Sequence, residues 1–433
     1  MVARRVSQVV VETEVLNETP VVRVSQALVE AEINQHRDVL ISQVVVEVEI
    51  EAPTAPATPE AGVAGLGTPR PYTAQLYRRN PAGPMAAVLP LPSPLRLRVT
   101  EIAYTAMGGC ELATIEAAGP EAALWQLANC LLSGVEIFDG HDARVWWGYV
   151  DELVVNAGGV TFGVSAAELA NRVAVAYAYT PVGSSTSTRE TTEWAEDAES
   201  IAEYGTFERL ESLDQAETIE AETRRDTVLA QYYLPIPTID TGSEDLGATL
   251  TCRGWYRLLE HRLYENAGTA EVETTAQIED VVGTAGEQLE GAEILDESGV
   301  DTNEYRDGDG NAWEQVTSLL ETGTSDGLRL LCRVTPGRAL QVYAEPMASV
   351  ADYMLTAEGW LLDRYSRPVR PSPDVVGRWA RLRDVVPASV DMTMLADPSL
   401  VFIESATYDV EAMRYRFEQR GRSVWDIGGV ERR

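Results

Sequence analysis

The sequence contains no lysine: all 34 of its basic residues are arginine, against 68 aspartates and glutamates. Without lysine, the phosphate-binding motif GxxxxGK(S/T) cannot be completed anywhere in the chain. The formal net charge of −34 disfavours adsorption to nucleic acid or to an anionic membrane surface, because both are themselves negatively charged. We therefore expect no tight nucleic-acid binding.

Cysteine and histidine are scarce, and their spacing fits no metal site. The four cysteines fall at 110, 130, 252 and 332, gaps that match neither a zinc knuckle nor a CxxC redox pair, so we expect buried thiols. The three histidines form no HExxH motif, and we expect structural or surface roles for them. They are His36, His141 and His261.

Long apolar runs are also missing. No stretch approaches the roughly 18 residues that a membrane-spanning helix needs. The N-terminus carries Arg4 and Arg5 without a following apolar region. We therefore expect no secretion signal, no membrane insertion, and folding in the cytoplasm of the cell that makes the chain. The hydrophobic fraction of 45% is typical of globular proteins, and a chain of this length has room for about two to four domains.

Catalytic motifs are absent as well, since there is no GxSxG elbow and no GxGxxG after a predicted strand. One segment, DGDGN, places Asp307, Asp309 and Asn311 at the first ligand positions of a calcium loop. Ala312 and Ser318 stand where that loop needs glycine and glutamate, so the segment instead predicts a tight turn with Asn311 capping the next helix. We expect no catalytic residues, no metal and no cofactor.

Three copies of one pattern open the chain: RVSQVVVETEV from Arg5, RVSQALVEAEI from Arg23 and LISQVVVEVEI from Leu40. Each alternates apolar and polar residues with a period of two, which is typical of a half-buried strand. Three strands alone are marginally stable in water, so we expect their apolar faces to dock on a partner surface. The candidate interaction residues are Val9, Val11, Val15, Val29, Ile33, Val44, Val46, Val48 and Ile50.

The remaining sequence predicts a mainly β (β-rich α+β) protein with antiparallel barrel-like domains, a few short helices, and about 40% strand and 20% helix. A helix is expected at about 216–231, ended by Pro235 and Pro237. The predicted segments are a strand-repeat arm at 1–52, a Pro/Gly/Ala linker at 53–71, a first barrel domain at 72–182, an acidic loop and helix insertion at 183–245, a second β/α unit at 246–345 and a β-rich C-terminal domain at 346–433.

Charge is unevenly distributed along the chain. Over 189–226 there are 13 acidic residues and 4 arginines, whereas 361–433 holds 12 arginines and 11 acidic residues. The acidic middle is explained either by solubility alone or by a surface along which DNA slides without binding.

The segment SGVEIFDGHDARVWWGYVDELVVNAGGVTFGVSAAELANRV, at 133–173, resembles the first barrel of bacteriophage tail hub proteins, the family of baseplate-hub and tail-tip proteins. The resemblance is carried by the strand at 135–138, the W-G-x-V step at 147–150, the glycine turn at 158–159 and 166–173, where the resemblance implies a short helix. The candidate barrel-core residues are Trp146, Trp147, Gly148, Tyr149 and Trp255.

Later stretches, such as TCRGWYRLLEHRLY and VVGRWARLRDV, resemble segments of tail proteins in their order along the chain and in their residue pattern. The resemblance therefore covers most of 72–433. The RVSQ-type repeats also resemble short repeats of phage virion proteins. The resemblance implies a trimeric ring at the distal end of the tail tube, which contacts tube and tip or fibre proteins and lets DNA pass, in the virion tail. Tail hubs usually lack a long repeated arm, so the arm's role is not implied.

Three other interpretations remain open. A tail-side or receptor-binding adhesin would show an exposed aromatic or sugar-binding cleft. A carbohydrate-active enzyme would use two of the many carboxylates, although the tryptophans fall mostly in predicted strands and are more typical of a core. A β-rich binding protein unrelated to phages is the last alternative.

Overall fold

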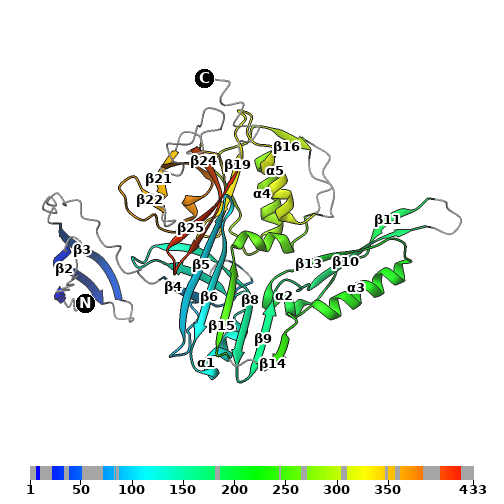
Figure 1. Cartoon of the computed structure of the whole chain (residues 1–433), viewed down its shortest axis with the longest axis horizontal. Coiled ribbons are helices and arrows are strands. Elements are labelled where there is room, and N and C mark those ends of the chain that lie inside the picture. Colours follow the sequence, from blue (N-terminus) through cyan, green and yellow to red (C-terminus); the bar gives the residue numbers. More distant parts are fainter. Residues whose placement is uncertain are drawn as a thin grey trace, which may run out of the picture. The chain divides into compact units, whose positions relative to one another are not determined.

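The structure is a computed structural model (Figure 1). It describes residues 6–9, 22–33, 39–50, 72–81, 83, 87–180, 186–242, 245–264, 271–303, 310–346, 350–355, 361–383 and 400–420, and for the strands before residue 51 it describes the backbone. The chain divides into two compact units, Met1–Thr68 and Pro69–Arg433. Among the described residues of the second unit, strands account for 44% and helices for 21%, which confirms the prediction of a mainly β protein with a few short helices.

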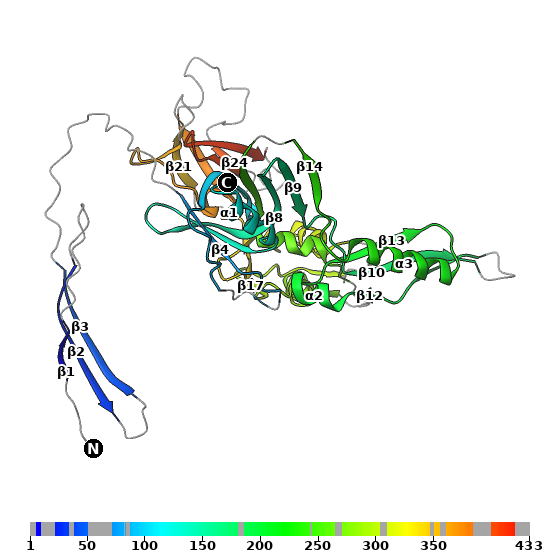
Figure 2. The same ribbon diagram turned by 90° about the horizontal axis from the view of Figure 1, so that it is seen from below.

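The first unit contains a three-stranded antiparallel sheet in the order β1-β2-β3 (Figure 2). Its strands are β1 (Val6–Val9), β2 (Val22–Ile33) and β3 (Val39–Ile50). The second and third sequence repeats are therefore the strands β2 and β3, as their alternation predicts. Val24 pairs with Val48 and Val29 with Val44, so the two copies run side by side in opposite directions.

The second unit is built on one large sheet, to which the described residues contribute 16 strands. They are β4 (Thr73–Tyr77), β5 (Arg96–Thr105), β6 (Met107–Ala118), β7 (Gly134–Phe138), β8 (Arg144–Ala157), β9 (Val160–Ser165), β14 (Thr238–Thr241), β15 (Gly247–Arg253), β17 (Ala292–Ile294), β19 (Leu330–Val334), β20 (Leu340–Ala344), β21 (Val350–Leu355), β22 (Leu361–Asp363), β23 (Arg378–Arg383), β24 (Leu400–Asp409) and β25 (Arg414–Arg420).

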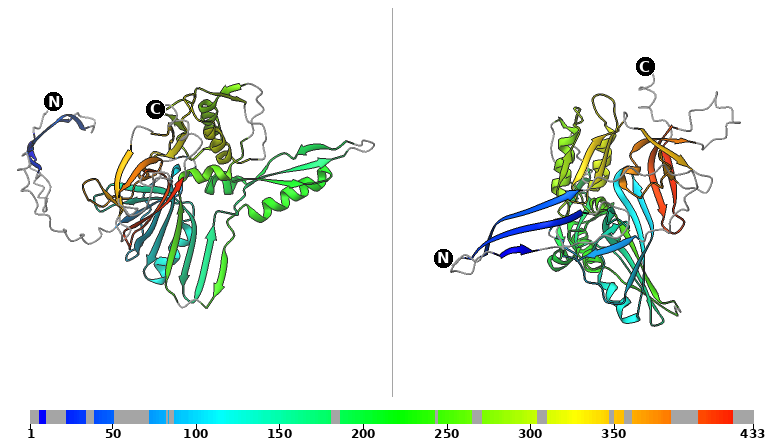
Figure 3. Two further views of the ribbon diagram at one scale, coloured as in Figure 1. Left: turned by 45° about the horizontal axis from the view of Figure 1, so that its top comes forward. Right: turned by 90° about the vertical axis from the view of Figure 1, so that its left-hand side faces the viewer.

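The main path of this sheet is β14-β9-β8-β15-β6-β5-β24-β23-β21-β22, and β7 pairs with β8 beside it. The sheet curls into a half-barrel (Figures 1 and 3). The largest fully buried side chains are Trp146 and Tyr104, and the Tyr104 hydroxyl donates to the carbonyl oxygen of Val145 at 2.8 Å. The curl thus buries large aromatic side chains without leaving this hydroxyl unpaired.

Strand β8 has two kinds of surface along its length. Its first half, 145–150, is buried at every position, whereas its second half alternates between buried and partly exposed residues. Consecutive side chains of a strand point to opposite faces, so the first half must be covered on both faces and the second half mainly on one. The unbroken apolar run VWWGYV fits the first environment, and the alternation in LVVNA fits the second.

A smaller four-stranded sheet carries a helix on one side and, with it, forms a lobe at 172–232 that we call the wing (Figure 3). Val173 of the sheet packs against Val228 of the helix, and Val175 and Tyr177 pack against Ala221. The apolar side chains at 221 and 228 lie two turns apart, on the helix face that meets the sheet. The wing elements are β10 (Arg172–Tyr179), β11 (Thr188–Thr191), β12 (Ala195–Glu196), α2 (Ala198–Tyr204), β13 (Glu208–Leu213) and α3 (Thr218–Tyr232).

Two helices, α4 and α5, pack together beside the large sheet (Figure 1). The side chain of Asn311 accepts a hydrogen bond from the backbone N–H of Glu314 at 2.8 Å, which confirms its predicted role as the cap of α5. The other elements are α1 (Glu121–Gln126), η1 (Leu127–Asn129), η2 (Trp255–His261), β16 (Glu271–Glu273), α4 (Thr274–Ala285), β18 (Asp301–Asn303), α5 (Ala312–Glu321) and η3 (Pro373–Val375).

Two local predictions are wrong. No helix forms at 166–173: the chain turns there and enters β10 at Arg172. The physical reason is Asn171, whose buried amide bonds the backbone of Gly205 and Phe207 and so fixes a turn rather than a helical register. The tryptophans are predicted to lie mostly in strands, but Trp255 begins the 3₁₀ helix η2 directly after β15. The predicted helix at 216–231 is confirmed as α3.

Two glycines allow β8, β15 and β6 to approach one another closely. A Cβ added at Gly148 would lie 2.0 Å from the carbonyl oxygen of Arg253, and one added at Gly254 would lie 1.8 Å from the carbonyl oxygen of Cys110. Both neighbours are backbone atoms in paired strands, which cannot rotate away as a flexible side chain would. Only glycine fits at these two positions.

We expect Gly148→Ala to lower the free energy of unfolding by about 2–4 kcal/mol, because the added methyl must displace a strand of the core. The matched control is Gly283→Ala in α4, where an added Cβ meets nothing within 4 Å. That variant should be neutral or more stable by up to about 1 kcal/mol. Urea unfolding of both variants measures the difference, and equal midpoints would refute the steric argument.

Candidate functional site

The structure brings the predicted barrel-core residues together. Trp146, Trp147 and Tyr149 lie on β8 and are at most 7% exposed, with Gly148 between them. Trp255 is 5% exposed, and its ring centroid lies 5.5 Å from that of Tyr149. This cluster is where η2 packs on the half-barrel. An aromatic cluster of this kind stabilises the sheet by packing.

Two contacts join this cluster to the hairpin of β19 and β20. The indole N–H of Trp147 donates to the carbonyl oxygen of Val334 at 2.8 Å. In the hairpin turn, the guanidinium carbon of Arg338 lies 3.6 Å from the ring centroid of Trp255. Burial lowers the pKa of Arg338 to about 10, yet the group stays charged at neutral pH. A desolvated cation over an indole contributes roughly 2 kcal/mol.

The candidate interaction residues of the arm divide into two groups. Val11 and Val15 lie outside the described residues. The others belong to the sheet of the first unit, and their role in docking remains a prediction. They are Val9 on β1, Val29 and Ile33 on β2, and Val44, Val46, Val48 and Ile50 on β3.

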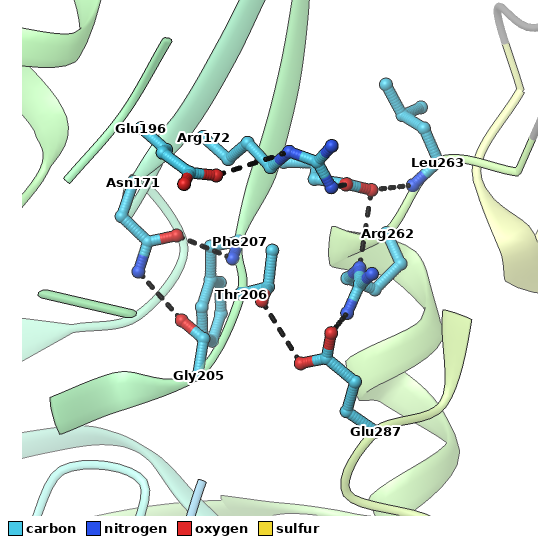
Figure 4. A network of polar contacts seen from close by, with 10 residues as sticks. Asn171, Arg172, Glu196, Gly205, Thr206, Phe207, Arg262, Leu263 and Glu287 are labelled. Atoms are coloured by element: carbon cyan, nitrogen blue, oxygen red, sulfur yellow. Dashed lines mark hydrogen bonds and ion pairs between the residues drawn. The ribbon is translucent and has the colours of Figure 1, made fainter. Parts of the chain in front are cut away.

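A buried polar network joins the wing to the rest of the second unit (Figure 4). Its centre is Glu208 at the start of β13, whose side chain is 5% exposed. The carboxylate accepts hydrogen bonds from Arg172 Nη1 at 2.7 Å, from Arg262 Nε at 3.3 Å and from the backbone N–H of Leu263 at 2.7 Å. Arg172 belongs to the wing, whereas Arg262 and Leu263 follow η2. One carboxylate therefore holds two parts of the unit together.

A second set of polar contacts links the wing to the same part of the unit. Arg262 Nη1 lies 3.2 Å from a carboxylate oxygen of Glu287, and the other oxygen of Glu287 accepts a hydrogen bond from Thr206 at 3.1 Å. Glu196 of the wing lies 3.9 Å from Arg172 Nε (Figure 4). The two arginines thus have carboxylates on more than one side, which offsets the cost of removing their charges from water.

Aromatic packing lies next to these charges. The ring of Phe207, 1% exposed, has its centroid 4.8 Å from that of His261. Burial lowers the pKa of His261 to about 4, so the imidazole is neutral at pH 7. A structural role for this histidine agrees with the prediction. His141 lies in an exposed turn before β8, and His36 lies outside the described residues.

Sequence reasoning did not predict the polar network around Glu208. Glu208 is one acid among 68, and its two arginine partners stand 36 and 54 residues away along the chain. No motif links positions so far apart. The only local hint is the apolar Phe207 directly before Glu208, which indicates a buried stretch inside an acidic segment.

Burial shifts the pKa of several thiols and carboxyls elsewhere in the second unit. All four cysteines are free and buried, as predicted, and burial raises the pKa of Cys130 to about 11 and of Cys332 to about 12. Burial also raises the pKa of Asp151, although Arg253 lies 3.7 Å away. Among the described side chains, no group of three His, Cys, Asp or Glu is placed to hold a metal ion. Asp307 and Asp309 lie outside the described residues.

A hollow of about 330 Å³ lies between the residues after β4, the turn η1 and the wing helix α2. Its walls include Arg78, Gln126, Asn129 and Cys130. Arg79 closes one side, where it donates to the carbonyl oxygen of Leu131 at 2.9 Å.

Within the described part of the chain, no helix is both long and apolar enough to span a membrane.

No family model and no curated protein matches the sequence. Among solved structures, the 43 kDa tail protein of prophage MuSo2 from Shewanella oneidensis is 10% identical, with 82% of this chain and 97% of that chain covered and a TM-score of 0.37. A tail protein from Neisseria meningitidis MC58 is 7% identical over 82% and 98%, with a TM-score of 0.36. Prophage tail protein gp18 from Listeria monocytogenes EGD-e is 9% identical over 83% and 98%, with a TM-score of 0.30. TM-scores this low establish neither a common fold nor a function.

We expect Glu208→Gln to lower the free energy of unfolding by about 2–4 kcal/mol, because it leaves the buried Arg262 and the partly exposed Arg172 without their shared counter-charge. Glu199→Gln on α2 is the matched control: its side chain is exposed, and the change should cost less than about 0.5 kcal/mol. Urea unfolding gives the cost, and hydrogen exchange should show faster opening in the wing for the first variant alone. Equal behaviour of both variants would contradict a junction role.

Proposed function

We propose that the chain is a structural subunit of a bacteriophage tail, specifically a hub or tail-tip protein. In this proposal it forms a homotrimeric ring at the distal end of the tail tube and joins the tube to tip or fibre proteins. DNA passes through the ring, and the protein takes part in no reaction.

The observation that supports the proposal most is where the hub-like segment lies. The strands β7, β8 and β9, all within 133–173, form adjacent parts of the curled half-barrel sheet. The resemblance places the first barrel of a hub in that same segment. A curled β-sheet in this segment supports the proposal, although the helix expected at 166–173 is a turn.

The open edge of the half-barrel favours assembly with further subunits. All four residues of the edge strand β14 are exposed, and Ile239 on it is 69% exposed. Just before it, Leu234 and Ile236 are 43% and 46% exposed. Exposed strand edges with apolar side chains are unusual on monomeric proteins, because they pair with other chains. A ring of subunits would cover them.

The charge also suits a passage for DNA. A basic lining would gain affinity for each phosphate that it neutralises, because counterions are released from the DNA. A chain with a net charge of −34 gains no such affinity and lets DNA slide past. We propose that acidic segments face the passage.

The first test is immunogold electron microscopy of intact particles from a culture that produces the protein, with antibody raised against 1–71. We expect gold clustered at one end of the tail. The same antibody preincubated with the arm peptide is the control and should leave the particles unlabelled. Label along the tail or on heads would replace the hub with another virion role, and absence of particle-bound label would refute the virion assignment.

Deletion of residues 1–52 tests the arm. The free energy of unfolding of the body should change by less than about 0.5 kcal/mol, because the two units are separately compact. Incorporation into particles, measured by immunoblot of purified virions, should fall. Loss of a cooperative unfolding transition would show that the arm is part of the core, and unchanged incorporation would refute its docking role.

A further inference from the structure

A tight turn after β22 is fixed by one carboxylate. At 363–367, the Asp363 side chain accepts hydrogen bonds from the backbone N–H groups of Tyr365 at 2.8 Å and Arg367 at 3.0 Å, and from Arg367 Nε at 2.9 Å. The backbone N–H of Asp363 donates to the carbonyl oxygen of Arg367 at 2.7 Å. So many bonds within five residues hold the turn in one conformation.

This turn presents an aromatic ring and two cations to solvent. Tyr365 is 61% exposed, and the guanidinium carbons of Arg364 and Arg367 lie 4.7 Å and 5.0 Å from its ring centroid. Arg364 also donates to the Tyr365 hydroxyl at 2.6 Å. Tyrosine and arginine dominate the energetic centres of protein interfaces, and a preformed arrangement loses little entropy on binding. We call the turn 363–367 the RYSR turn.

The RYSR turn lies in a basic part of an acidic chain. Residues 361–383 hold six arginines and two aspartates, although the whole chain carries a net charge of −34. Arg367 and Arg370 pair with Asp363 and Asp139, whereas Arg364 has no carboxylate partner among the described residues. Charge complementarity therefore predicts an acidic partner surface for this turn.

The wing is such a surface. Its segment 189–226 holds 13 acidic residues and 4 arginines. The side chains of Glu193, Glu199, Asp214 and Glu222 are exposed there, and none of them makes an ion pair within the described structure. Within one copy, no ion pair between described residues joins the wing to the RYSR turn.

We propose that the RYSR turn of one copy docks on the acidic wing of a second copy. This rests on the self-assembly contained in the proposed function and names the surfaces that would mediate it. Two different surfaces meet in such a contact, so it is heterologous, and repetition of it closes a ring when the rotation between copies permits. Arg364 supplies an unpaired charge, Tyr365 supplies contact area, and Arg367 keeps the turn in shape.

The test measures self-association of the full chain by sedimentation velocity at about 50 mM and about 500 mM salt, a range over which exposed charge pairs become strongly screened. Arg364→Glu and Tyr365→Ala should each raise the dissociation constant by at least about tenfold at low salt. Arg367 is retained in both variants because it braces the turn. Arg96→Glu is the control for net charge, since Arg96 is also exposed but lies on β5, and it should change the constant less than about twofold.

Charge reversal on the wing completes the test. Glu199→Arg or Glu222→Arg alone should weaken association, and one of them combined with Arg364→Glu should restore it by at least about fivefold. If neither Arg364→Glu nor Tyr365→Ala changes the dissociation constant of self-association, this contact is refuted, and the proposed hub role is unaffected. A chain that stays monomeric would overturn the contact too, while the immunogold result decides the hub role separately. If Arg96→Glu weakens self-association as much as Arg364→Glu does, the effect is one of overall charge, and the contact is refuted.

Discussion

The pairing of β8 along both of its edges is the constraint on which the second unit depends. One edge pairs first with β7 and then with β9, and the other edge pairs with β15. Both edges are occupied at Tyr149, opposite Gly134 and Arg253, and again at 152–156, which lies between β9 and β15. The close approach permitted by Gly148 and the aromatic cluster around Trp255 both follow from this arrangement. The curl of the sheet and the position of η2 on it also follow from the pairing of β8.

Arginine serves two physical purposes in this chain. Where it is buried, as Arg262 is beside Glu208, it joins elements that are distant in sequence, and its charge is matched by carboxylates and a hydrogen-bond network. Where it is exposed, it changes the local sign of a surface that is otherwise acidic. The planar guanidinium suits both purposes, because it bonds carboxylates through several N–H groups and stacks on rings such as Trp255.

The sequence predicts well what depends on local pattern. The β-rich class, the helix α3, the cap at Asn311 and the buried tryptophans of β8 follow from periodicity, cap chemistry and apolar runs. It predicts poorly what depends on tertiary partners. The alanines and leucine at 166–170 suit a helix, but Asn171 bonds a backbone segment more than 30 residues away. The helix α4 was missed because its sequence mixes threonine, acids and glycine, and its stability comes from packing with α5.

The strands on either side of the wing are hydrogen-bonded neighbours. Gly163 of β9 pairs with Thr238 of β14, so the chain leaves the large sheet after Ser165 and returns at the adjacent place. In topological terms β9 and β14 are a hairpin whose loop has grown into a folded lobe. The outer part of such a lobe can be exchanged or shortened without altering the order of any strand in the large sheet, provided that Phe207 stays in the core and Glu208 keeps its bond to Arg262. Evolution and protein engineering can therefore vary the exposed contacts of the wing independently of the half-barrel that carries it.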